Sequence, residues 1–213
     1  LMNTISARQN RGRGCLAWLA GVGAFVGGLM LLGAVYEKIA EDSDARRFPA
    51  PGKLVDVGGY RLHINCTGTG SPTVVIDAGL GDWSTMWAWV QPEVAKKTQV
   101  CTYDRAGNGW SDPGPLPRDA AQFARELQTL LRVANIPGPY VLVGHSLGGL
   151  SARVFAGMYP SEVAGVVLID SMSPRQFRQA STNTAPRVNS QQHPFTLFAA
   201  LARIGFVRLL FRP

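Results

Sequence analysis

Histidine and cysteine are scarce in this sequence, with three of each among 213 residues. They do not fall into any spacing typical of metal ligands, so we expect neither a metal ion nor another cofactor. The net charge is +7, but the positive residues are dispersed and form no basic stripe with interleaved aromatic residues. We therefore expect no nucleic-acid binding. The sequence also has no internal repeat and no low-complexity tract, and its length suits one core of ordinary size.

The most apolar part of the sequence is the run 15–36, CLAWLAGVGAFVGGLMLLGAVY, which carries no charge. As a helix rising ~1.5 Å per residue, a run of this length spans about 33 Å, enough to cross the core of a bilayer. Three arginines precede it in the tail 1–14, and several acidic residues follow it. The positive-inside rule then places the N-terminus in the cytoplasm and the rest of the chain outside it. We predict a single-pass membrane anchor, with a cleaved signal peptide and a buried soluble helix as alternatives.

Beyond the apolar run, charge gives way to proline and glycine over residues 37–52, which is typical of a linker. From residue 53 to residue 170, short β-like runs alternate with helical stretches, after an initial hairpin that turns at Gly58-Gly59. This alternation predicts an α/β fold, with a mostly parallel sheet and helices on both of its faces.

Residues 140–160, YVLVGHSLGGLSARVFAGMYP, pass from a β-branched strand through Gly-Xaa-Ser-Xaa-Gly into a helical stretch. Such a turn holds the Ser146 hydroxyl at the C-terminal edge of the sheet, and glycines at 144 and 148 leave room for it. The amide of Leu147 then points to the position where an acyl oxyanion develops. We predict that Ser146 is a nucleophile. The alternative is a structural turn that carries this pentapeptide by chance.

Four motifs, in this order, resemble those of the α/β-hydrolase fold of serine esterases, lipases and peptidases. They are VVIDAGLGDWSTMW, YDRAGNGWSD, GHSLGG and VAGVVLID. The resemblance covers about residues 55–170 and implies the strand order 1-2-4-3-5-6. It also implies that the amides of Leu80 and Leu147 form the oxyanion hole. The tryptophans of the first motif would pack against the sheet, one of them lining an acyl pocket: Trp83, Trp87 and Trp89.

A nucleophilic serine needs a base that takes its proton and a carboxylate that orients the base. His63 lies in the early hairpin, so we expect an ordinary strand residue. His145 adjoins the serine, so its ring is expected to project away from the hydroxyl. His193 lies in the polar segment where the family inserts its cap, and we expect a cap residue there.

The family places its acid and its histidine after two further strands, which are not visible before residue 213. Some members carry the acid at the end of the sixth strand, where this sequence has Asp170. Asp170 is therefore the only candidate acid, and we expect the catalytic histidine to lie beyond residue 213. Residues 171–213 are interpreted as the start of a cap or lid.

The resemblance also bears on the residues around strands 2 and 4. Cys66 and Cys101 fall near the ends of these two strands, which are neighbours in the fold. In an extracytoplasmic domain they would form a disulfide, and two buried thiols are the alternative. Asp104 and Arg105 are expected to brace the loop that follows the fourth strand rather than to react.

Together these features predict a membrane-anchored serine hydrolase. It would cleave a small-molecule ester or amide through an acyl-enzyme on Ser146, and residues 15–36 would be its contact with the membrane. The alternatives are a non-catalytic binding protein of the same fold and an inactive fragment that lacks its base and acid. The sequence determines neither the substrate nor the oligomeric state.

Overall fold

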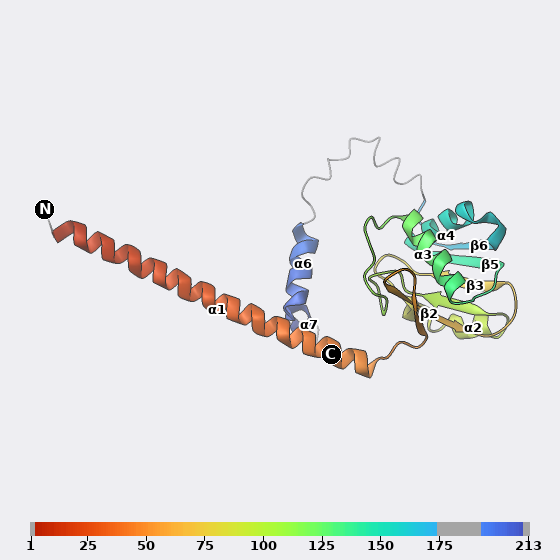
Figure 1. The fold of residues 1–213 in the computed structure, drawn as a ribbon, viewed down its shortest axis with the longest axis horizontal. Helices are drawn as coiled ribbons and strands as arrows, with labels where there is room; N and C mark the ends of the chain where they lie inside the picture. Colours follow the sequence, from red (N-terminus) through yellow and green to blue (C-terminus); the bar gives the residue numbers. More distant parts are fainter. Residues whose placement is uncertain (1–2, 174–192, 211–213) are drawn as a thin grey trace, which may run out of the picture. The chain divides into compact units, whose positions relative to one another are not determined.

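A computed structural model describes residues 3–173 and 193–210, with side chains from Trp18 onward in the first range and from Leu197 onward in the second. These residues form two compact units. One unit holds the N-terminal helix α1 together with the C-terminal helices α6 and α7. The other begins at Ala50 and holds the sheet (Figure 1).

Helix α1 runs from Asn3 to Arg47. Its most apolar stretch has a mean hydropathy of 1.9 and no residue buried within the protein. Within the described part of the chain it is the one helix long and apolar enough to cross a membrane. A signal sequence near an N-terminus has the same length and composition. The third alternative, a buried helix of a soluble core, is not favoured, because none of the residues in that stretch is buried.

Helix α1 also continues through most of the segment 37–52 that the sequence indicates as a linker. This stretch contains good helix formers, and Lys38 pairs with Asp42 one turn later at 3.0 Å. The helix ends just before Pro49, since proline disfavours a helical conformation in the residue that precedes it. Residues 48–52 thus connect α1 to β1 without helical structure.

The sheet has six strands in the order β1-β2-β4-β3-β5-β6, as the resemblance implies. The first two pair antiparallel, β2 also pairs antiparallel with β4, and the remaining pairs are parallel. The strands are β1 (Lys53–Asp56), β2 (Arg61–Thr67), β3 (Thr73–Asp77), β4 (Val100–Tyr103), β5 (Tyr140–His145) and β6 (Val163–Ile169).

Helices cover both faces of the sheet (Figure 1). One face packs its apolar side chains against α3 (Ala120–Val133) and α4 (Leu147–Met158) and forms the core, with Leu62 and Phe155 completely buried. The other face is covered by the 3-10 helix η1 (Ser84–Trp87) and by α2 (Gln91–Ala95). The remaining elements are η2 (Pro160–Glu162), α6 (His193–Arg203) and α7 (Phe206–Leu210).

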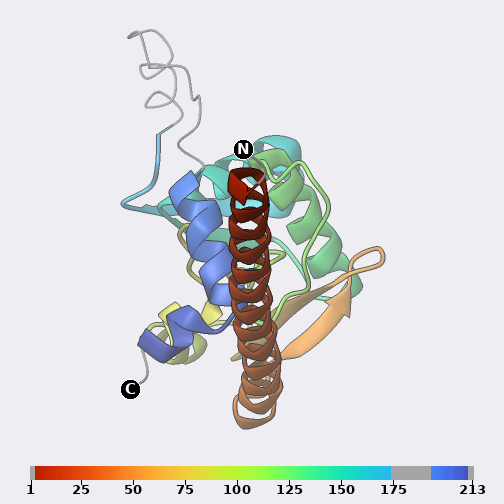
Figure 2. The ribbon, with the colours of Figure 1, turned by 90° about the vertical axis from the view of Figure 1, so that its left-hand side faces the viewer.

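The β1–β2 hairpin lies at one edge of the sheet and turns where the sequence predicts (Figure 2). Gly58 and Gly59 have φ values of 120° and 95°, and both amides donate to the Asp56 carboxylate. Cys66 of β2 and Cys101 of β4 are directly opposite each other in the register, and a disulfide joins them. Of the two alternatives for these cysteines, the structure has the disulfide.

Candidate functional site

Ser146 lies at the turn between β5 and α4, with φ 52° and ψ −115°. Residues other than glycine adopt such a conformation only where their surroundings impose it, and they concentrate at functional sites. Two backbone bonds supply that restraint. The Ser146 amide donates to the Ile169 carbonyl at 3.2 Å, and the Met172 amide donates to the Ser146 carbonyl at 3.0 Å. The end of β6 and the loop after it therefore hold the turn in place.

The glycines around Ser146 allow three backbone segments to meet. A Cβ on Gly144 would lie 2.4 Å from the Gly149 Cα, and a Cβ on Gly148 would lie 2.4 Å from the Asp77 carbonyl oxygen. The first turn of α4 thus packs directly on the end of β3. The Leu147 amide is one of the groups at the N-terminus of α4 that lack an intrahelical partner, and the helix dipole makes this end positive.

The loop after β3, which carries Leu80, is hydrogen-bonded to the Arg105 side chain. This buried guanidinium donates to the Asp77 carboxylate and to the carbonyls of Ala78 and Gly79. Because both carbonyls are fixed, the direction of the peptide that follows them is restrained. Leu80 itself is 80% exposed, at the tip of the turn. The sequence predicts that Arg105 braces its own loop; the structure shows that it also fixes the neighbouring one.

Asp104 organises the loop after β4. Its buried carboxylate accepts from the amides of Ser84 at 2.7 Å and Trp110 at 3.1 Å, and it lies 2.9 Å from the Nδ1 atom of His63. Burial alone raises the pKa of Asp104, but the bonds from His63, Ser84 and Trp110 outweigh it and hold the pKa below its ordinary value. His63 is completely buried in β2, and its contact with Asp104 is part of this network.

His145 contacts the loop after β3, although 38% of its side chain is exposed. Its Nδ1 atom lies 4.0 Å from the Asp82 carboxylate. The centroids of the His145 and Trp87 rings are 6.5 Å apart, and the two rings are nearly perpendicular. A Cβ on Gly79 would lie 3.0 Å from the same Nδ1 atom, so ring and loop are in close contact. Together with Ala78 and Met86, these side chains line a cavity of about 200 Å³.

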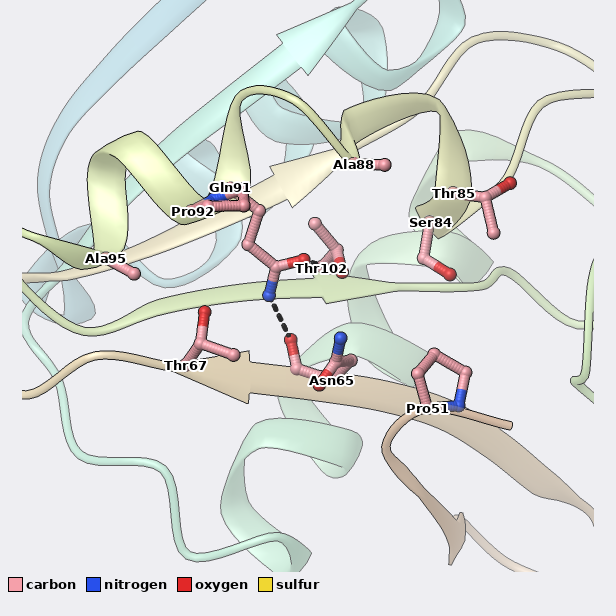
Figure 3. A pocket seen from close by; sticks show the side chains of 10 residues that line it. All are labelled: Pro51, Asn65, Thr67, Ser84, Thr85, Ala88, Gln91, Pro92, Ala95 and Thr102. Carbon is pink, nitrogen blue, oxygen red and sulfur yellow. Dashed lines mark hydrogen bonds between the residues drawn. The ribbon is translucent and has the colours of Figure 1, made fainter. Parts of the chain in front are cut away.

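A larger cavity of about 480 Å³ lies on the α2 face of the sheet (Figure 3). Gln91 is the most connected of its polar side chains. Gln91 donates to the Asn65 carbonyl at 2.9 Å and accepts from the Thr102 hydroxyl at 3.1 Å. Both ends of the Gln91 amide are therefore satisfied within the protein.

The other candidate residues are not assembled into a triad within the described part of the chain. Asp170 is exposed at the end of β6 with φ 41°. His193 begins α6, but its side chain lies outside the described residues. Among the residues that the structure describes, none forms a hydrogen bond with the Ser146 hydroxyl.

Sequence reasoning missed three features of this region. It missed the hydrogen bonds from Arg105 to the loop after β3 and the pairing of His63 with Asp104, since both depend on which strands become neighbours. The sequence also predicts that three tryptophans pack against the sheet. Trp87 lines the cavity beside His145, but Trp89 is 93% exposed and Trp83 is 41% exposed. Trp83 precedes η1 and Trp89 lies in the turn that follows it, so neither is held in a helix against the sheet.

A family model described as "alpha/beta hydrolase fold" matches residues 72–198, more than half of the chain. A protein of Hormonema carpetanum, named as a probable transporter, is 31% identical over 150 residues, which is 67% of this chain and 20% of that protein. The chain spans between a fifth and about half of the length of the curated relatives it matches.

Solved structures show the same likeness. Cfl2 from Burkholderia cenocepacia is 27% identical with a TM-score of 0.57, over 70% of this chain and 54% of that one. A thermophilic esterase from Thermogutta terrifontis is also 27% identical, with a TM-score of 0.52, over 63% of this chain and 54% of the esterase. Residues 72–198, which the family model matches, contain the serine turn and the loop after β3.

Proposed function

Since this chain belongs to the α/β-hydrolase family, we propose that it is a membrane-anchored serine hydrolase that cleaves an ester or amide through an acyl-enzyme on Ser146. The observation that carries the proposal is the backbone of Ser146, held at φ 52° between the end of β5 and the N-terminus of α4. This conformation lifts the hydroxyl out of the strand at the sheet edge. The likeness to an esterase supports the same reaction class.

In the proposed reaction, the Ser146 oxygen attacks the substrate carbonyl, and the carbonyl oxygen takes up the negative charge. The amides of Leu147 and Leu80 donate to that oxyanion, the first at the positive end of α4 and the second on the loop fixed by Arg105. Collapse of the tetrahedral intermediate expels an alcohol or amine and leaves the acyl-enzyme, which water then hydrolyses. The cavity beside His145 is the proposed space for part of the small-molecule substrate.

The attack also needs a base that takes the hydroxyl proton. We assign this role to a histidine outside the described residues. Asp170 is the candidate acid that orients it, because it lies in the segment that bonds to the backbone of Ser146 on both sides, through Ile169 and Met172.

The membrane part of the proposal has α1 as a retained anchor and the sheet unit outside the cytoplasm. The arginines of the N-terminal tail favour that orientation. The disulfide between Cys66 and Cys101 supports it, since disulfides persist in oxidising compartments and are rare in the cytosol.

The test is labelling of the protein in its native membranes with a fluorophosphonate probe, which reacts with activated serines. We expect one labelled peptide, which contains Ser146, and loss of labelling in Ser146→Ala. Ser161→Ala is the matched control, because Ser161 is exposed on η2 and should leave labelling unchanged.

An unlabelled Ser146 in protein that is folded and membrane-bound would remove the nucleophile from the proposal. It would favour a non-catalytic binding protein that has kept the fold.

A further inference from the structure

The half-buried residues of α1 lie along one stripe near its C-terminal end. All other described side chains of α1 are exposed, whereas this stripe has positions three and four residues apart: Gly33, Ala34, Tyr36, Glu37, Ala40 and Asp44. Residues at this spacing share one face of a helix. Helix α7 and the turn that precedes it lie beside this face (Figures 1 and 2).

The contact between the helices is close at the turn that joins α6 to α7. A Cβ on Gly33 would lie 2.3 Å from the Ile204 carbonyl oxygen. Gly205 has φ 72°, and a Cβ there would lie 2.9 Å from the Tyr36 ring. Glycine at both positions lets the two backbones meet, as small residues do where helices pack in membranes.

Arg208 of α7 adds a charge-specific contact to this packing. Its guanidinium donates to Glu37 at 2.9 and 3.1 Å and to Asp44 at 2.5 Å. The two acidic residues are two helical turns apart on the same face of α1, so a single side chain bridges them. A bidentate guanidinium–carboxylate bond fixes the register of α7 on α1 as well as its proximity.

Much of the described surface of α6 and α7 is apolar and exposed. Its exposed large side chains are Leu197, Phe198, Phe206, Leu209 and Leu210. Between α7 and α1 runs an apolar groove of about 580 Å³, lined on the α1 side by Val26, Leu29, Met30, Leu32, Gly33 and Tyr36. Leaving such a surface in water is unfavourable.

The position of this groove along α1 indicates that lipid covers it. The groove lies beside Val26–Tyr36, which is the second half of the apolar run, while Glu37 and Asp44 lie just beyond the end of that run. If α1 spans the bilayer, the groove is level with lipid tails and the ion pairs are level with the head groups. Arg208 then neutralises acidic groups at a depth where an unpaired charge is costly.

We infer that α6 and α7 form a membrane-interface element, docked on α1 through Gly205 and Arg208, whose apolar side chains insert into the lipid of the outer leaflet. This inference rests on the proposed membrane anchoring by α1. It makes α1 a retained part of the folded protein, because removal of α1 as a signal peptide would also remove the surface on which α7 packs.

The test uses the full chain with Cys15→Ser, reconstituted in phosphatidylcholine vesicles, and a fluorescent label on Leu209→Cys. We expect quenching by a lipid-borne spin label and protection from aqueous iodide. A label on Leu116→Cys is the matched control, since Leu116 is 85% exposed on a loop of the sheet unit and should be quenched by iodide. Alkaline carbonate extraction of the same vesicles reports on α1 separately.

Charge variants then test the docking contact. Arg208→Glu should abolish the lipid quenching at position 209, and adding Glu37→Arg and Asp44→Arg should restore it. Arg203→Glu should change nothing, because Arg203 is exposed and has no ion pair among the residues that the structure describes. Iodide quenching at position 209 in a chain that resists carbonate, or unchanged lipid quenching in Arg208→Glu, overturns the inference and leaves the anchor intact. Extraction by carbonate overturns the anchor as well.

Discussion

At the scale of single residues, the buried side chains of Asp104 and Arg105 support the loops around Ser146. Asp104 accepts hydrogen bonds from two backbone amides and from His63, all within the interior. A buried carboxylate is tolerated only when such donors replace water. The lowered pKa of Asp104 reports that its ionised form is the one that the fold stabilises.

We predict that Asp104→Asn lowers the free energy of unfolding by about 3 kcal/mol at pH 7, because it breaks a buried charged network. The folded pKa is depressed, so the stabilisation exists above the unfolded pKa of about 3.9 and is lost as the pH falls through the folded value. The difference between wild type and variant should therefore shrink toward pH 3. Urea unfolding of the detergent-solubilised chain, followed by tryptophan fluorescence, measures it.

Asp112→Asn is the control for this prediction. Asp112 pairs with Arg61 at 2.8 Å on a more exposed surface, and the effect of its loss should be much smaller. Equal effects of the two substitutions, or a difference for Asp104→Asn that does not narrow in acid, would contradict a role for the buried charge.

At the scale of elements, the site consists of a strand-to-helix turn and a loop from the neighbouring strand. The turn is rigid because α4 packs on β3 through glycines. Two carbonyls of the loop, those of Ala78 and Gly79, accept from Arg105, which reaches them from the end of β4. Such loops fix the direction of an amide only if the carbonyls before it are restrained.

Arg105→Lys should therefore slow fluorophosphonate labelling of Ser146 by about 10- to 100-fold, in line with a misplaced oxyanion donor. A lysine has one ammonium group and cannot reach the Asp77 carboxylate and two carbonyls in the planar geometry of a guanidinium. Second-order labelling rates measure the effect.

Arg118→Lys is a matched control for that prediction. Both guanidiniums lie over the Phe123 ring, at 5.5 Å for Arg105 and 5.0 Å for Arg118, and both pair with a buried carboxylate. Arg118 bonds to Glu126 of α3 rather than to the loop. An Arg118→Lys variant that slows labelling as much as Arg105→Lys would mean that general destabilisation, not loop position, sets the rate.

At the scale of the whole molecule, the chain joins an apolar helical unit to a hydrolase-type sheet unit. The proposed topology places the sheet unit in an oxidising compartment. The redox state of Cys66 and Cys101 can report that topology, because the disulfide between β2 and β4 forms only where thiols are oxidised.

We predict that, in a host with a reducing cytosol, the full chain carries Cys66 and Cys101 as a disulfide. A variant without residues 3–36 should keep both as thiols, because its sheet unit stays in the cytosol. Lysis into an alkylating reagent followed by mass spectrometry distinguishes the two states, and Cys15 of the full chain serves as the free-thiol control. Reduced cysteines in the full chain, or a disulfide in both forms, would contradict the proposed topology.

The strand order was expected from the resemblance to the α/β-hydrolase fold, whereas the sequence by itself determined the individual strands, the serine turn and the apolar helix. Each of these depends on local pattern: β-branched runs, the glycines around Ser146 and a charge-free stretch long enough for a bilayer. The hairpin turn at Gly58 and Gly59 was likewise predictable, because positive φ values require glycine there.

The tertiary structure alone decided which side chains meet. Arg105 reaches the carbonyls of Ala78 and Gly79, and His63 meets Asp104, because β3 and β2 both lie next to β4, although they are distant in the sequence. Arg208 bonds to Glu37, which is 171 positions away in the sequence, because α7 packs on α1. Local pattern specifies strands and turns, whereas contacts between distant residues depend on packing, which no single segment encodes.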